Sequence, residues 1–179
     1  MEHTIVIGHI ALIQKSKKQW FTLDLIKVLR EKGYDAVGVF AGECREPAYM
    51  SELNRKIEEY GLSGQTIFLG RRNDIPDLLK MVDVLIIPSA FEGFPLAGLE
   101  AAAAGVPVIA CDAAGAKEFI QVSKDGLTFK EDDVDSAVNA VEGIMKDRES
   151  FQKAGESFAA EMTDQKYASK LDRIFSEIE

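Results

Sequence analysis

Short apolar runs alternate with helix-like stretches along most of this 179-residue chain. The apolar runs contain few polar residues, which is typical of strands buried on both faces, and the stretches between them place apolar residues at helical spacing. The alternation predicts an α/β chain with a single doubly wound parallel sheet of about six strands, followed by C-terminal helices. The expected strands are 4–12, 35–41, 66–69, 84–88, 106–110 and 127–130. The expected helices are 17–32, 47–60, 75–81, 95–104 and the stretch from 133 onward.

Composition narrows the classes of protein to consider. The chain is 46% hydrophobic, 28% charged and carries a formal net charge of -9, and its last 49 residues hold 13 acidic and 6 basic side chains. A nucleic-acid partner is not expected, because phosphate backbones require a basic face. No apolar run is long enough to span a bilayer, and the N-terminus lacks a signal-peptide pattern, so we expect a cytoplasmic protein. Two cysteines and two histidines, far from metal-ligand spacing, indicate no metal site.

The loop after the expected fourth strand has the chemistry of an anion site. In a doubly wound sheet, ligands bind at the carboxyl ends of the strands near the switch in strand order. Gly93 allows close backbone approach, and Pro95 suits the first helical turn. The amides of Phe94, Leu96 and Ala97 are then expected to face the crevice, where the helix dipole favours a pyrophosphate.

Two carboxylates bracket this anion site. Glu92 precedes the expected helix and Glu100 lies within it, with seven residues between the two. A carboxylate can accept two neighbouring hydroxyls, which suits the diols of ribose or a hexose. Taken singly, each would be a solvated surface charge, and it is their combination with Gly93 and Pro95 that favours a sugar-nucleotide site.

The run PSAFEGFPLAGLEAAAAGVPVIACDAAGAKEF, residues 88–119, resembles the C-terminal, donor-binding domain of retaining glycosyltransferases of the family-4 type (glycosyl transferases group 1). Those enzymes have the GT-B fold, which consists of two Rossmann-like domains. The preceding FLGRRNDIPDLLKMVDVLIIPS also fits the family pattern, and the likeness extends over residues 5–178. The resemblance implies a nucleotide-diphosphate sugar as donor, transfer of a hexosyl group and no metal or other cofactor.

The resemblance also implies roles for individual residues. The second Glu of the family motif, here Glu100, binds the ribose hydroxyls, and the first, Glu92, lies beside the transferred sugar as a catalytic residue. Backbone amides of the segment 93–97 hold the sugar hydroxyls and the distal phosphate. The base is expected near the loop that carries Arg71, Arg72 and Asn73.

One part of the family pattern is different here. The family has an Arg and a Lys after the first strand, where they neutralise the diphosphate. In this chain His9 follows Gly8 at the Arg position, which implies weaker or pH-dependent neutralisation, since an ordinary His titrates near about 6.5. The equally open alternative is that His9 is only a packed residue at the end of the strand. Lys17 aligns best with the family lysine and is the second expected catalytic residue, with Lys18 a close competitor and Lys15 a third candidate. Arg71 or Arg72 is an alternative cation from the neighbouring loop.

Two further expectations concern the rest of the molecule. Glu118 is expected to bond backbone groups in a short helix that caps the crevice. The chain, 1–179, is expected to be the donor-binding domain alone, either a fragment or a natural half-enzyme, that binds a nucleotide-sugar but transfers little without an N-terminal acceptor domain. The apolar stripe in 164–179 predicts self-association through the last helix.

Two other interpretations of the protein's function stay open. One is a non-catalytic nucleotide-binding or interaction module, such as a receiver-like α/β domain, and the other is a fragment of a sugar-nucleotide epimerase.

Overall fold

The computed structural model describes residues 4–113, 115–162 and 166, and its centre is a six-stranded sheet. The strands are β1 (Ile5–Ile10), β2 (Ala36–Ala41), β3 (Thr66–Phe68), β4 (Val84–Ile87), β5 (Val108–Cys111) and β6 (Gly126–Phe129). The helices are α1 (Gln19–Glu31), α2 (Pro47–Glu59), α3 (Ile75–Leu79), α4 (Leu96–Ala103), α5 (Ala116–Ser123), α6 (Val134–Lys146) and α7 (Arg148–Glu161), with a 3-10 turn, η1 (Lys15–Lys17), before α1.

The strand order is β3-β2-β1-β4-β5-β6, and every neighbouring pair is parallel. The chain therefore winds outward from β1 in one direction, then crosses to β4 and winds outward in the other. This confirms the predicted doubly wound sheet. The connections on either side of β1 and β4 leave in opposite directions, so a crevice is expected above the carboxyl ends of these two strands.

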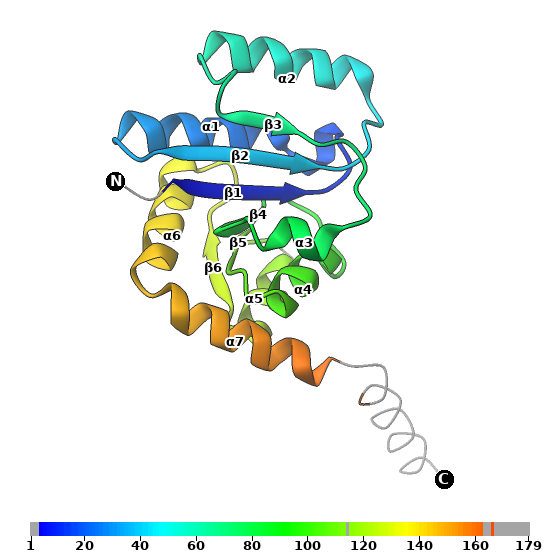
Figure 1. Ribbon diagram of the computed structural model, residues 1–179, viewed down its shortest axis with the longest axis vertical. Coiled ribbons are helices and arrows are strands. Elements are labelled where there is room, and N and C mark those ends of the chain that lie inside the picture. Colours follow the sequence, from blue (N-terminus) through cyan, green and yellow to red (C-terminus); the bar gives the residue numbers. More distant parts are fainter. Residues whose placement is uncertain (1–3, 114, 163–165, 167–179) are drawn as a thin grey trace.

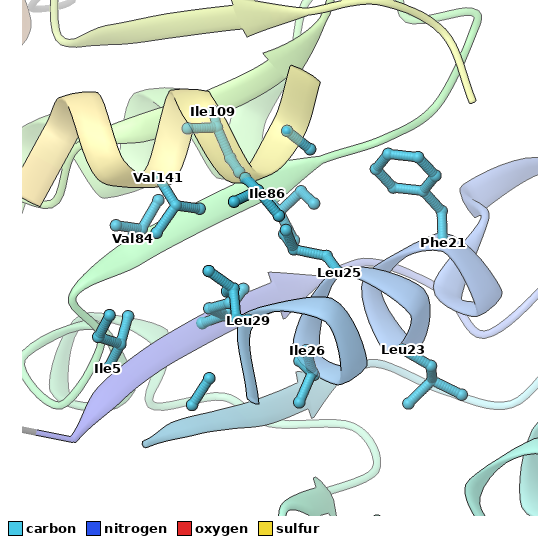
Figure 2. Close-up of a cluster of buried hydrophobic side chains, with 14 of the residues drawn as sticks. Ile5, Phe21, Leu23, Leu25, Ile26, Leu29, Val84, Ile86, Ile109 and Val141 are labelled. Carbon is cyan, nitrogen blue, oxygen red and sulfur yellow. The ribbon is translucent and has the colours of Figure 1, made fainter. Parts of the chain in front are cut away.

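Two hydrophobic clusters cover the two faces of the sheet. Side chains alternate along each strand, so that in β4 Val84 and Ile86 join one cluster while Leu85 and Ile87 join the other. The first cluster packs against α1, α2 and α6, and the second against α3, α4, α5 and α7 (Figure 1). Figure 2 shows the first cluster, in which Leu25 of α1 points toward Ile86. Because β4 is buried on both faces, its sequence is continuously apolar, as predicted.

The predicted element boundaries differ from the observed ones by a few residues, and one difference affects the site. Pro95 was expected inside the first turn of its helix, but it is the N-cap, with extended φ and ψ of -78° and 93°, and α4 begins at Leu96. The predicted helical stretch from 133 onward is two helices, which are separated at Asp147 (φ -141°). The predicted helix over 164–179 lies outside the described residues except for Lys166.

Candidate functional site

A cavity of about 240 Å³ opens at the carboxyl ends of β1 and β4, where the strand order switches. Its walls come from the end of β1, from η1, from the end of β4 and from the loop that enters α4. The lining residues are His9, Ile10, Ala11, Lys17, Ile86, Ile87, Pro88, Ser89, Glu92, Phe94, Pro95, Leu96 and Ala97. His9 and Lys17 therefore lie around one cavity with Glu92 and the predicted segment 94–97.

The first turn of α4 supplies hydrogen-bond donors to this cavity. The carbonyl of Pro95 accepts from the amides of Gly98 and Leu99. The amides of Leu96 and Ala97 precede these and have no helical carbonyl to bond. Both residues line the cavity. An anion beside them would receive two amide donors and the positive end of the helix dipole.

Lys17 and Glu92 meet across the cavity. The Nζ of Lys17 lies 2.7 Å from Oε1 of Glu92, and the two side chains are only 25% and 16% exposed. Lys17 comes from η1 and Glu92 from the loop between β4 and α4, 75 residues apart in the sequence. Their ion pair joins the two loops that form the mouth of the crevice.

His9 lines the cavity as a neutral side chain. It is 2% exposed, its Nδ1 shares a 2.8 Å hydrogen bond with Oγ1 of Thr22, and its ring packs against Phe40. Burial, aided by the nearby charge of Lys17, lowers the pKa of His9 to about 3. The expectation of a histidine that titrates near 6.5 is therefore wrong, and the alternative of a packed strand-end residue is confirmed. Near neutral pH His9 brings no positive charge to the site.

Lys18 faces away from the cavity. Its backbone is left-handed (φ 51°, ψ 44°), so its side chain leaves the turn in a different direction from that of Lys17. Its Nζ lies 2.7 Å from both Glu131 and Asp132, in the connection between β6 and α6, and these carboxylates raise the pKa of the lysine against the opposing effect of burial. Lys15 pairs with Glu52 of α2. The structure thus places Lys17, of the three candidate lysines, in the cavity wall.

A second cavity of about 420 Å³ adjoins the first and shares Ile10 and Ala11 with it. Arg71 and Arg72 line it, together with the end of β2 and the start of α3. Arg72 makes a two-bond ion pair with Asp74, so its charge is already partnered. Together the two cavities are lined by residues from the start of α4 to the β3–α3 loop.

Five predicted residues lie outside both cavity walls: Gly8, Lys18, Asn73, Gly93 and Glu100. Glu100 is exposed on α4, and Asn73 is exposed in the β3–α3 loop. Gly8 lies inside β1, paired with Val39 and Leu85, where a Cβ would approach two carbons of Val82 to 2.9 Å. The small size of Gly8 therefore serves the packing of β1, while the proposed ribose contact of Glu100 stays a prediction.

The Glu92–Gly93 backbone rests directly on Gly115, which is the N-cap of α5. A Cβ at Gly115 would lie 1.8 Å from the carbonyl oxygen of Glu92, and its φ is +81°. The Oε2 of Glu118 accepts a 2.6 Å hydrogen bond from the amide of Gly115. This confirms the structural role expected for Glu118, and it shows that the β5–α5 loop supports the cavity wall.

The sequence prediction did not single out six lining residues of the cavity, namely Ile10, Ala11, Ile86, Ile87, Pro88 and Ser89. Ser89 is 2% exposed and lines the cavity directly after β4. Ala11 lies at the end of β1, where a Cβ on Gly42 would come within 1.8 Å of its carbonyl oxygen. The position of Ser89 directly after a buried strand could have predicted it as a site residue. The contact between Ala11 and Gly42 joins distant segments, and no local sequence pattern predicts it.

The described residues contain no group of three or more His, Cys, Asp or Glu side chains placed to hold a metal ion. Within the same residues, no helix is both long and apolar enough to cross a membrane.

The fold and the crevice define a Rossmann-like α/β domain with a cavity at its switch point, where ligands bind in doubly wound sheets. The sequence profile of the family "Glycosyl transferases group 1" matches residues 2–160. The chain therefore belongs to the group 1 glycosyltransferases, which confirms the resemblance to that family.

Curated relatives include transferases of different specificity. The chain is 35% identical over 114 residues to a lipopolysaccharide core biosynthesis mannosyltransferase of Rhizobium meliloti, a match that covers 62% of this chain and 32% of the relative. It is 35% identical over 115 residues to a UDP-Gal:alpha-D-GlcNAc-diphosphoundecaprenol alpha-1,3-galactosyltransferase of Escherichia coli, covering 64% and 29%. The matches thus span about a third of each relative.

Solved structures agree on the fold. The chain superposes on Anabaena HepE, solved with UDP and glucose, with a TM-score of 0.84 and 24% identity, over 95% of this chain and 48% of that one. It superposes on the C-terminal domain of a group 1 glycosyl transferase from Francisella tularensis with a TM-score of 0.77 and 25% identity, over 90% and 87%. The GT-B type of Rossmann-like domain is thereby shown.

Proposed function

We propose that this chain is the donor-binding half of a glycosyltransferase that moves a hexosyl group from a nucleotide-diphosphate sugar to an acceptor. The observation that carries the proposal is the convergence of Lys17, Glu92 and the free amides of Leu96 and Ala97 on one cavity at the switch point. Cation, carboxylate and helix N-terminus are the groups that a diphosphate and a sugar require side by side.

Each group has a chemical role in this proposal. The amides of α4 and Lys17 take up the negative charge that grows on the leaving diphosphate, which lowers the barrier to transfer. Glu92 accepts hydroxyls of the transferred sugar, and Glu100 accepts those of the ribose. The nucleobase extends along the crevice toward Arg71, Arg72 and Asn73.

The acceptor half is part of the same proposal. The matches cover 32%, 29% and 45% of three transferase relatives. The Francisella domain that this chain superposes on is described as C-terminal. We propose that an N-terminal domain binds the acceptor across the crevice, that configuration at the transferred sugar is retained, and that the chain alone transfers little. Robust transfer by the isolated chain would contradict this last point.

Three accompanying proposals come with it. Lys17 and the α4 amides neutralise the diphosphate without a metal ion, so a chelator should leave nucleotide affinity unchanged. The enzyme works in the cytoplasm, at the inner membrane surface through its acceptor half. The chain self-associates through residues 164–179, which light scattering over a concentration series tests.

The direct test of the proposed function is calorimetric titration with UDP, GDP and ADP and with UDP-glucose, GDP-mannose and ADP-glucose. At least one nucleotide pair should bind, and Glu100→Ala should abolish that binding by removing the partner of the ribose hydroxyls. Glu58→Ala, an exposed carboxylate on α2, is the matched control and should bind normally. Absence of binding by all six compounds would refute the donor-site assignment, and unchanged binding by Glu100→Ala would refute the ribose role.

A further inference from the structure

The cavity at the switch point contains a charge balance of its own. Lys17 is its cationic lining residue and Glu92 its anionic one, and each is the other's partner at 2.7 Å. The remaining lining residues are apolar or neutral, including His9, whose pKa of about 3 keeps it uncharged. The described wall of the cavity therefore has no net charge before a ligand enters.

The backbone on both sides of the ion pair is held by its neighbours. Lys18 is anchored to Glu131 and Asp132, which fixes the turn from which Lys17 projects. On the other side, the carbonyl of Glu92 packs against Gly115. Lys17 and Glu92 are thus presented to each other from two braced loops, and exchange of partners requires only side-chain rotation.

A diphosphate that binds beside the amides of Leu96 and Ala97 meets this ion pair directly. It competes with Glu92 for Lys17, and the carboxylate repels it. A free nucleoside diphosphate ends in a phosphate monoester and carries about one negative charge more than its sugar ester near neutral pH. The sugar ester also brings hydroxyls, which can donate to the carboxylate that Lys17 releases. The cost of opening the pair is thus compensated for the sugar conjugate and not for the free diphosphate.

We propose that Glu92 is a specificity-determining residue that makes the site prefer the sugar-bearing nucleotide to the spent nucleoside diphosphate, by competing for Lys17. This inference rests on the proposed function. It gives the ion pair a role in turnover, because after transfer the sugar hydroxyls leave, Glu92 recovers Lys17, and the nucleoside diphosphate loses its cation and dissociates.

The test compares the affinities of UDP and UDP-glucose, of GDP and GDP-mannose, and of ADP and ADP-glucose for the chain and for Glu92→Gln, by calorimetry. For the pair that binds, neutralising Glu92 should strengthen binding of the free diphosphate by about five- to twenty-fold, which corresponds to roughly 1–2 kcal/mol for a partly buried charge. The sugar conjugate should gain less or bind more weakly, so that selectivity for the sugar conjugate falls.

Two further variants make the result specific. Glu58→Gln removes an exposed carboxylate on α2, outside the cavity wall, and should leave both affinities within about two-fold. In a Lys17→Met background, Glu92→Gln should strengthen binding of the free diphosphate by less than it does in the native chain, because no lysine is left to release. Circular dichroism melts of the ligand-free variants confirm folding, and Glu92→Ala replaces Glu92→Gln if the latter is unfolded.

The outcomes separate the two ideas. If a nucleotide binds but neutralising Glu92 leaves the affinity of the free diphosphate unchanged or weaker, the inference is overturned and the donor site stands. If no nucleotide binds to the native chain or to the Glu92 variants, the proposed function fails and the inference fails with it.

Discussion

Asp125 is a buried carboxyl whose ionisation should destabilise the fold. It lies between α5 and β6 with no exposed surface, and its Oδ1 accepts a 2.6 Å hydrogen bond from Ser123. Its Oδ2 has no hydrogen-bond partner among the described residues. Gly155 of α7 packs against it, so close that a Cβ there would lie 3.0 Å from the Cβ of Asp125. Burial, opposed by the bond from Ser123, raises the pKa of Asp125 from 3.8 to about 6.

The sign and size of the effect follow from proton linkage. Between pH 3.8 and 6 the folded chain holds a proton on Asp125 that the unfolded chain has lost, so this group lowers stability as pH rises through that window. Above pH 6 the ionised carboxylate lowers the free energy of unfolding by its full amount, which for a pKa raised by about two units is roughly 3 kcal/mol. At pH 5 the cost is about half of that, since most of it develops between pH 4 and 6.

The perturbation is Asp125→Asn, which keeps an acceptor for Ser123 and removes the charge. Urea unfolding of both chains at pH 5 and pH 8 gives the difference in free energy of unfolding at each pH. That difference should move by roughly 1.4 kcal/mol in favour of the variant between pH 5 and pH 8. Any pH-independent cost of burying the amide is the same at both pH values and cancels in this comparison. The contributions of titratable groups that both chains share cancel as well.

Glu58→Gln, an exposed carboxylate on α2, is the matched control and should show no comparable change. A difference for Asp125→Asn that is the same at both pH values, within about 0.5 kcal/mol, would refute the assignment of a raised pKa to this carboxyl.

Two other predictions concern the site. Because the pKa of His9 is lowered, the folded chain binds fewer protons than the unfolded chain below pH 6.5, so His9 should lower the free energy of unfolding by about 2 kcal/mol between pH 7.5 and pH 5. In urea unfolding, His9→Gln should lack this acid-induced loss. An equal loss in both chains would show that His9 titrates normally. Gly115→Ala should lower the free energy of unfolding by at least about 2 kcal/mol and weaken nucleotide binding, because its Cβ would collide with the Glu92 carbonyl at a left-handed φ. Gly64→Ala, where the space is open, is the control and should be close to neutral. Equal stability of the two variants would contradict the contact between Gly115 and Glu92.

Much of the fold was predictable because its signals are local. Strands that are buried on both faces must be continuously apolar, as in Val84–Ile87, and helices must present apolar residues at helical spacing. Boundaries were less accurate, as Pro95 shows, because a proline fits both the N-cap and the first turn, and the surrounding chain selects between them.

Part of the candidate site was likewise visible in the sequence. The loop 88–97, with its glycine, proline and carboxylate, lies at the switch point as a strand–loop–helix pattern requires. Local sequence could not choose among Lys15, Lys17 and Lys18, since three lysines on one short turn look equivalent until the directions of their side chains are known.

The tertiary structure alone decided those directions and the electrostatics of the site. The left-handed backbone at Lys18 directs its side chain toward Glu131 and Asp132, more than a hundred residues away in the sequence. Lys17 is left to pair with Glu92 at the crevice. Burial makes His9 neutral, although its sequence position suggested a titrating cation. Pairing and burial depend on which distant segments come together, so the sequence determined the fold and the chemical groups available, and the packing determined which of those groups face one another.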